Sequence, residues 1–150
     1  AGKRTKIAVI SNNPLVGAIG TCVGHMGGRI QAVIKEVGAS EKIDVLEWSD
    51  DPKVFIANSL KPAKVLKVDV LNEAEKQAIA VVDNDQLSLA IGKQGVNVRL
   101  SVRLTTWKLD VITDPNSNSK IGNPLSSNGG NSFSFSHLII FILCLVCINM

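Results

Sequence analysis

Residues 85–100 decide the fold, and they read Asp-Gln-Leu-Ser-Leu-Ala-Ile-Gly-Lys-Gln-Gly-Val-Asn-Val-Arg-Leu. Inside this stretch, Gly92-Lys93-Gln94-Gly95 is a Gly-x-x-Gly loop between two segments rich in apolar residues. Before the loop, apolar residues fall at i, i+3 and i+4 (Leu87, Ala90 and Ile91), which predicts a helix. After the loop, residues 96–104 alternate between apolar and polar, a period that by itself favours a strand.

The same arrangement occurs earlier in the chain, where Gly24-His25-Met26-Gly27 lies 68 positions before the second loop (92 − 24). The apolar residues ahead of the two loops align one to one, Ile19, Cys22 and Val23 with Leu87, Ala90 and Ile91. Behind the loops, residues 42–46 align with residues 108–112 once a two-residue gap is placed near 38–40. Internal repetition of this extent indicates a duplicated module.

The repeat resolves the ambiguity after the second loop. In the first copy, the matching apolar residues recur at i, i+3, i+4 and i+7 (Ile30, Val33, Ile34 and Val37), which predicts an amphipathic helix. Gly38 stands where the C-terminal cap of that helix belongs. We therefore expect residues 96–104 to form a helix as well.

The remaining segments predict further strands and helices around the two loops. Alternation and turn residues predict strands at 5–10, 43–48, 65–70, 77–82 and 107–113. Helices are expected from Pro14 to the first loop, from Asp51-Pro52 to Pro62, and ahead of the second loop with a cap at Asp83–Asp85. The sequence thus predicts an α+β fold in two units, 1–62 with a connecting helix and 63–113, followed by a low-complexity tail at 114–150.

The two copies are unequal, because the second has a helix and two strands ahead of its loop pair and the first has one strand. We therefore expect the first unit to be incomplete, with its opening elements upstream of Ala1, and to expose a strand edge. The tail has the composition of a linker and ends in an apolar run, Leu138–Ile148, whose 11 residues are fewer than the roughly 20 that span a membrane. A membrane partner is not expected, and we interpret the sequence after Thr113 as foreign to the module.

Composition narrows the class of function. With 45% hydrophobic and 19% charged residues the chain is globular, and its net charge of +3 permits a nucleic-acid partner without requiring one. Aromatic residues make up 4%, which disfavours a sheet that stacks bases on aromatic rings. The three cysteines indicate neither a disulfide framework nor, at Cys144 and Cys147, a metal or redox site. The sequence has no nucleotide-binding or zinc-protease motif and no nucleophile–base pair, so no enzyme, cofactor or small-molecule substrate is expected.

Residues 85–100, followed by Thr106–Val111, resemble the second KH domain of the NusA family of bacterial transcription factors. Residues 5–9, 20–33 and 41–48 resemble the first KH domain of the same family. The resemblance implies two tandem type II KH domains, with helices on a three-stranded mixed sheet and the first domain truncated at its N-terminus. It also implies one extended surface for single-stranded RNA, in a factor that modulates pausing, termination and antitermination by RNA polymerase.

The two loops are the expected RNA sites. Glycine lets a phosphate approach the backbone, and the helix that follows offers unpaired N–H groups and a positive dipole end. The second loop carries the better charge and is expected to dominate. The expected contact residues are Gly24, His25, Met26, Gly27 and Arg29 in the first copy and Gly92, Lys93, Gln94, Gly95, Arg99 and Arg103 in the second, with Val23, Ile30, Ile91 and Val98 lining a groove for bases.

Some of these residues have equally plain structural explanations. Arg99 and Arg103 fit a solvated helix face as well as a phosphate site. Trp48 and Trp107 are expected to pack against other side chains rather than to stack on bases.

Two other functions stay open. In one, the KH pair is a protein-interaction module that docks on RNA polymerase or a termination factor through acidic residues on one side (Glu73, Glu75, Asp83 and Asp85). In the other, the chain is a truncated product without function. Contact with an RNA polymerase elongation complex is also open, because the sequence lacks the polymerase-binding and S1 domains of the family. The family implies the bacterial cytoplasm, or a plastid for a nuclear-encoded eukaryotic copy.

Overall fold

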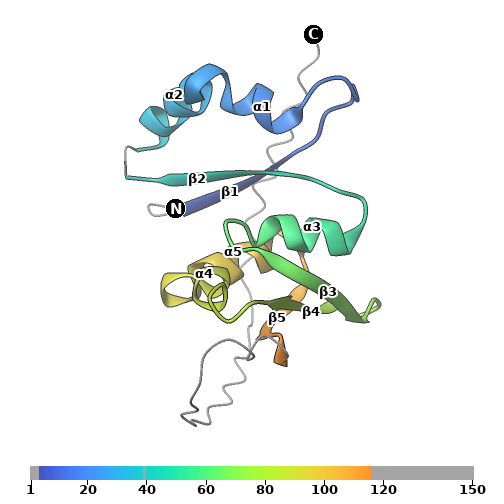
Figure 1. Ribbon diagram of the computed structural model, residues 1–150. Helices are drawn as coiled ribbons and strands as arrows, with labels where there is room; N and C mark the ends of the chain where they lie inside the picture. The colour runs from blue at the N-terminus through green and yellow to red at the C-terminus, as the bar shows by residue number, and fades with distance from the viewer. Residues whose placement is uncertain (1–3, 39, 116–150) are drawn as a thin grey trace.

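The computed structural model describes residues 4–38 and 40–115, and these form an α+β chain of two similar units (Figure 1). The first unit contains β1 (Arg4–Val9), α1 (Ala18–Val23), the one-turn helix η1 (His25–Gly27), α2 (Gly28–Val37) and β2 (Lys42–Glu47). The second contains α3 (Pro52–Ser59), β3 (Val65–Asn72), β4 (Gln77–Val82), α4 (Leu87–Ile91), η2 (Lys93–Gly95), α5 (Val96–Thr105) and β5 (Lys108–Thr113). The predicted α+β class is confirmed.

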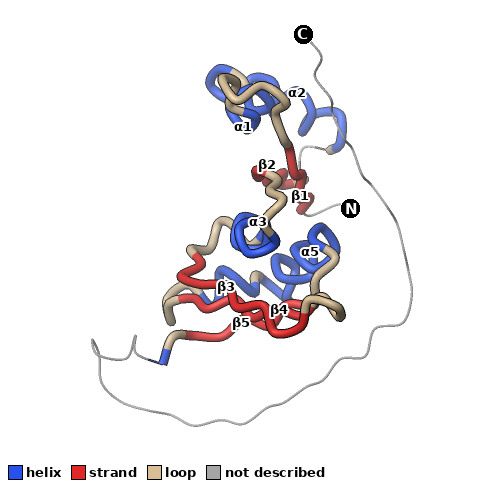
Figure 2. The backbone as a smooth tube through the Cα atoms, turned by 90° about the vertical axis from the view of Figure 1, so that its right-hand side faces the viewer, coloured by secondary structure: helices blue, strands red, loops and turns tan. Residues whose placement is uncertain are grey.

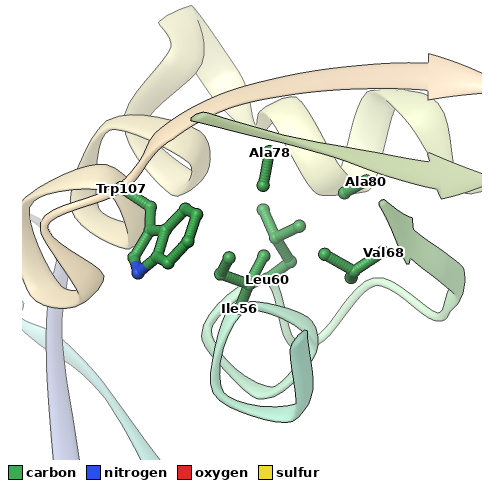
Figure 3. Packing of buried hydrophobic residues seen from close by; sticks show 6 residues of the cluster. All are labelled: Ile56, Leu60, Val68, Ala78, Ala80 and Trp107. Carbon is green, nitrogen blue, oxygen red and sulfur yellow. The ribbon is translucent and has the colours of Figure 1, made fainter. Parts of the chain in front are cut away.

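The second unit is built on a three-stranded mixed sheet in the order β3-β4-β5. β3 and β4 are antiparallel, whereas β4 and β5 are parallel, and helices α3 and α5 lie on one face of this sheet (Figure 2). The core lies between the sheet and these helices, and Ile56 of α3 and its C-cap residue Leu60 point into it (Figure 3). The core residues are Ile56, Leu60, Val68, Ala78, Ala80 and Trp107. Trp107 therefore packs in the interior, as expected.

The helix α3 belongs to the core of the second unit. Asp51 caps its start by accepting a hydrogen bond from the Lys53 backbone N–H at 2.8 Å, and Pro52 occupies the first turn. Ile56 and Leu60 are fully buried under the second sheet. We therefore propose that the division between the two units falls in residues 49–51, ahead of α3, rather than after Pro62.

The first unit repeats part of this plan. β1 and β2 are parallel with Arg4 opposite Lys42, and β4 and β5 are parallel with Gln77 opposite Lys108. Among the described residues, the first unit has no counterpart of α3 or β3. Figures 1 and 2 both show α1 and α2 on one side of the β1–β2 pair, with α3 and α5 of the second unit on the other.

The helix after the second loop is confirmed, and its packing explains why its sequence alternates. The most buried residues of α5 are small and polar (Asn97, Ser101 and Thr105), and they recur at i, i+4 and i+8 on one face. Ser101 donates to the Ser59 carbonyl at 2.7 Å, so this polar face packs against α3 through hydrogen bonds. The exposed polar residues Arg99 and Arg103 follow the buried polar residues Asn97 and Ser101 by two positions. Polar residues therefore occur at every second position of this helix, which is why its sequence resembles that of a strand.

Two predicted helix starts are wrong. The helix predicted from Pro14 begins only at Ala18, because the side chain of Asn13 accepts the Leu15 N–H and its carbonyl accepts the Val16 N–H, which makes a turn. The N-cap residue of α4 is Gln86 rather than one of Asp83–Asp85, because the Gln86 N–H bonds to the Asp83 carbonyl in a turn and the helix starts after it.

The tail and its neighbourhood are only partly described. The predicted linker from 116, the apolar run Leu138–Ile148 and the pair Cys144 and Cys147 lie outside the described residues. Within the described part of the chain, no helix has the length and apolar character to cross a membrane.

Candidate nucleic-acid interface

The two Gly-x-x-Gly loops share one backbone conformation. The φ angle is +77° at Gly24 and +75° at Gly92, and +77° at Gly27 and +71° at Gly95. The third position also has positive φ, +50° at Met26 and +55° at Gln94. Positive φ at three of four positions produces the sharp turn between helices and favours glycine at both ends of the loop. The repeat found in the sequence therefore extends to the backbone angles.

The first glycine of each loop is also required by close packing. A Cβ atom on Gly92 would lie 2.7 Å from Asn97 Cβ and 2.9 Å from its backbone nitrogen. A Cβ atom on Gly24 would lie 2.7 Å from Arg29 Cγ. The contact at Gly92 includes backbone atoms of Asn97, which are fixed in a helix, whereas the contact at Gly24 involves only side-chain atoms of the exposed Arg29. The second loop is therefore held more tightly than the first.

Asn97 holds the second loop in place, and the sequence did not single it out. It is almost completely buried, and its Nδ2 donates to the carbonyls of Ala90 at 3.0 Å and Leu89 at 3.3 Å, at the end of α4. The same group donates to the carbonyl of Leu60, the C-cap residue of α3, at 3.0 Å. One side chain thus joins α3, α4 and the start of α5. The signal was present in the repeat, because Asn97 aligns with Arg29.

Arg29 has the corresponding role in the first unit. Its Nη1 donates to the Thr21 carbonyl at 2.8 Å, and Thr21 aligns with Leu89 in the repeat. In both units, the same position therefore binds a carbonyl at the end of the helix before the loop. Arg29 is exposed, so the guanidinium has further donors for an anion, but its fixed contact is within the protein.

The remaining expected contact residues are exposed. The middle residues of both loops, His25, Met26, Lys93 and Gln94, are exposed, and Met26 reaches 92%. Arg99 and Arg103 are also exposed, one turn apart on α5. They follow the buried Asn97 and Ser101 by two residues, and two residues turn a helix by about 200°, so both arginines lie opposite α3.

Each loop ends at the N-terminus of a ten-residue helix, α2 or α5. The N-cap residues are Gly27 and Gly95, which have no side chain to accept hydrogen bonds from the first turn. Such N–H groups and the positive helix end attract anions. At the second loop, Lys93 adds a positive charge beside them.

The expected base groove stays a prediction. Ile91 is exposed, and Val23, Ile30 and Val98 are half-buried, so all four have surface available beside the loops. A hollow among the described residues lies elsewhere, between α3 and β3, where Val54, Ala57 and Leu66 line it.

Comparisons with known proteins agree with this geometry. The family model "NusA-like first KH domain" matches residues 1–48, and the model "NusA-like second KH domain" matches residues 52–119. The crystal structure of APE1850 superposes with a TM-score of 0.52 at 24% identity, over 75% of this chain and 80% of that one, which supports the fold.

Three bacterial relatives are named "Transcription termination/antitermination protein NusA". The proteins of Halalkalibacterium halodurans and Bacillus subtilis are 50% and 49% identical over 76% of this chain. That of Thermus thermophilus is 51% identical over 72% of the chain. The chain spans 29%, 30% and 27% of these relatives' lengths, respectively. In that part, the chain belongs to the NusA family and carries its first and second KH domains in tandem.

Proposed function

We propose that the chain binds single-stranded RNA through both glycine loops, as the RNA-binding part of a NusA-like transcription termination and antitermination factor. The observation that carries the proposal is the pair of loops with one backbone conformation, each opening onto a helix N-terminus without a side-chain cap. A KH loop of this kind clamps about four nucleotides of backbone. The relatives' name supplies the setting in transcription.

The second loop contributes most of the affinity. Lys93 lies within the loop, and Arg99 and Arg103 extend the positive charge along the exposed face of α5. The first loop presents His25 and Met26, which bring little charge. Three phosphate contacts at the second unit correspond to a slope of about −2 in a plot of log affinity against log salt concentration.

Reversal of charge in the loop tests the proposal. The double variant Lys93→Asp/Gln94→Asp places two carboxylates against the phosphates, and aspartate tolerates the positive φ at position 94. We expect it to weaken binding to a single-stranded oligonucleotide by at least about tenfold, equivalent to about 1.4 kcal/mol. The matched variant His25→Asp/Met26→Asp makes the same change in the first loop and is expected to weaken binding less.

Fluorescence anisotropy at several salt concentrations gives both the affinity and the salt slope. Far-UV circular dichroism shows that each variant is folded. If the folded Lys93→Asp/Gln94→Asp variant bound RNA with the affinity of the wild type, RNA binding by the second loop would be ruled out.

The protein-docking alternative gains no support from the arrangement of the acidic residues. Glu73 and Glu75 lie in the turn ahead of β4, and Asp83 and Asp85 follow its other end. Six residues of strand, about 20 Å, separate the two pairs, so they do not form one acidic patch. Capture of RNA polymerase that persists after ribonuclease treatment would favour docking over RNA binding.

The same proposal predicts the binding partners of the chain and its cellular location. Single-stranded RNA is the direct partner, and an RNA polymerase elongation complex is reached through the transcript. The chain acts as a binding module rather than as an enzyme. The named relatives are bacterial, so we expect a bacterial cytoplasmic setting, or a plastid for a nuclear-encoded copy.

A further inference from the structure

The C-terminus of α3 is a junction between the two units. The carbonyl of its last residue and the carbonyls of the next two residues each accept a hydrogen bond from a side chain elsewhere in the chain. The Ser59 carbonyl accepts from Ser101 Oγ at 2.7 Å, and the Leu60 carbonyl accepts from Asn97 Nδ2 at 3.0 Å. The next carbonyl, that of Lys61, accepts from Lys6 Nζ at 2.7 Å. Ser101 and Asn97 belong to the second unit, whereas Lys6 belongs to strand β1 of the first.

Lys6 is buried at this junction with its charge compensated. Its side chain is 1% exposed, and its Nζ lies 3.3 Å from Asp44 Oδ2. Asp44 in turn accepts two hydrogen bonds from Arg4, at 2.6 and 3.0 Å. Burial of an ammonium group is costly unless it is paired and hydrogen-bonded. The arrangement of Asp44 and the Lys61 carbonyl around Lys6 meets that requirement.

The repeat shows that the KH fold does not itself require this lysine. Lys6 is opposite Asp44 in the β1–β2 pair, and the corresponding pair in the second unit is Ile79 opposite Asp110. The strand position is therefore apolar where no second unit packs on it. A lysine at position 6 serves the contact between the units.

Helix α5 packs against β1, and two further contacts between the units lie beside the short linker. Asn58 Nδ2 donates to the Glu47 carbonyl at 3.1 Å, and the rings of Trp48 and Phe55 lie 6.3 Å apart. Both contacts are close to residues 49–51 and act near the pivot. The bond from Lys6 to Lys61 joins residues 55 positions apart and lies at the far end of α3. It is placed to stop the units from rotating about the linker, and Figure 1 shows α3 between the two sheets.

The junction connects directly to the second loop. Asn97 binds the Leu60 carbonyl next to Lys61, and it also binds the carbonyls of Leu89 and Ala90 just before Gly92. The end of α3, the end of α4 and the second loop are therefore one packed body. Whatever fixes Lys61 to the first unit also fixes the second loop relative to that unit.

We propose that Lys6 is a positioning residue that holds the two glycine loops in a fixed relation, so that one RNA strand engages both. The proposal rests on the RNA-binding function proposed above. A rigid pair of sites gains affinity for a long strand because the second binding event is intramolecular. A strand that reaches only one loop gains nothing from the relation between the units.

The test compares two single-stranded oligouridines on the full chain. One has about four nucleotides, which fills one loop, and the other has about twelve, which reaches both. Lys6→Met keeps an unbranched side chain but removes the charge and the donor. We expect it to lower affinity for the long strand about tenfold and to leave affinity for the short strand unchanged. The matched control Lys67→Met removes an exposed lysine away from the junction and is expected to bind both strands like the wild type.

A second measurement tests directly whether the junction fixes the orientation of the two units. Residual dipolar couplings of the free chain give the orientation of each unit, and we expect a single alignment for both units in the wild type and separate alignments in Lys6→Met. If Lys6→Met does not fold, Lys6→Gln is measured instead, because its shorter neutral side chain also loses the contact with Lys61. Equal loss for both strands, or no loss for either, would overturn the proposal, as would a variant whose units keep one alignment. If the wild type bound neither strand, the RNA-binding function would fail, while the couplings would still decide whether Lys6 fixes the units.

Discussion

Substitution of Gly92 by alanine is expected to be the most damaging small change in either loop. At φ +75° and ψ 166°, Gly92 has a conformation that only glycine adopts readily, and a side chain there costs about 1–3 kcal/mol. The added Cβ would also lie 2.9 Å from the Asn97 backbone nitrogen, and such overpacking costs about 1–3 kcal/mol more. We therefore expect Gly92→Ala to lower the free energy of unfolding by about 3–5 kcal/mol, a large part of the 5–15 kcal/mol typical of a domain.

Two matched substitutions separate these contributions. Gly95→Ala has a left-handed conformation, at φ +71° and ψ 16°, and nothing within 4 Å of its Cβ, so it is expected to cost about 1–2 kcal/mol from strain alone. Gly24→Ala has the backbone strain of Gly92 but meets only side-chain atoms of Arg29 and no backbone atom, so it is expected to cost an intermediate amount.

Urea unfolding followed by tryptophan fluorescence measures these costs, because Trp107 is buried in the core of the second unit and Trp48 is half-buried where the two units meet. The expected order of destabilisation is Gly92→Ala, then Gly24→Ala, then Gly95→Ala. Equal destabilisation by Gly92→Ala and Gly95→Ala would refute the inference that Asn97 crowds the first glycine.

Further predictions concern the residues that stabilise α3, the second loop and the junction between the units. Asp51→Ala removes the N-cap of α3 and is expected to lower the free energy of unfolding by about 1 kcal/mol, measured with urea. The control Asp50→Ala changes the neighbouring residue, which is not the N-cap, and should cost less. Asn97→Ala removes the two amide hydrogens that the carbonyls of Leu60, Leu89 and Ala90 share, and it is expected to cost about 2–4 kcal/mol; a cost below that of Asp51→Ala would contradict the assigned role. Burial lowers the pKa of Lys6 below 10.5, against the opposing effect of Asp44, so the folded state releases this proton before the unfolded chain does. The stability of the wild type relative to Lys6→Met should therefore rise as the pH increases towards 10.5, and a falling difference in urea unfolding would show that pairing with Asp44 outweighs the effect of burial on this pKa.

The sequence predicted the fold most reliably where two copies could be compared. Period alone assigned residues 96–104 to a strand, and the first copy corrected this to a helix because its apolar residues have helical spacing. Residues 42–46 and 108–112, which the repeat aligns, likewise lie in corresponding strands, β2 and β5. Each of these strands is parallel to its neighbour, β1 or β4. The loops were found for the same reason.

The failures came from contacts that a pattern of apolar residues does not contain. The start of α1 was misplaced because the side chain of Asn13 forms a local turn, and the start of α4 because Asp83 accepts through its backbone rather than its side chain. Asn97 and Lys6 were missed because a polar residue in a helix or strand is usually solvated, and only tertiary contacts show that these two are buried.

The most direct test of RNA binding is a titration of the labelled full chain with single-stranded RNA, followed by two-dimensional amide NMR. We predict the largest shifts at Gly92–Gly95 and the first turn of α5, smaller shifts at Gly24–Gly27, and little change at the hollow between α3 and β3. Shifts confined to that hollow, or no shifts at either loop, would contradict the proposed function.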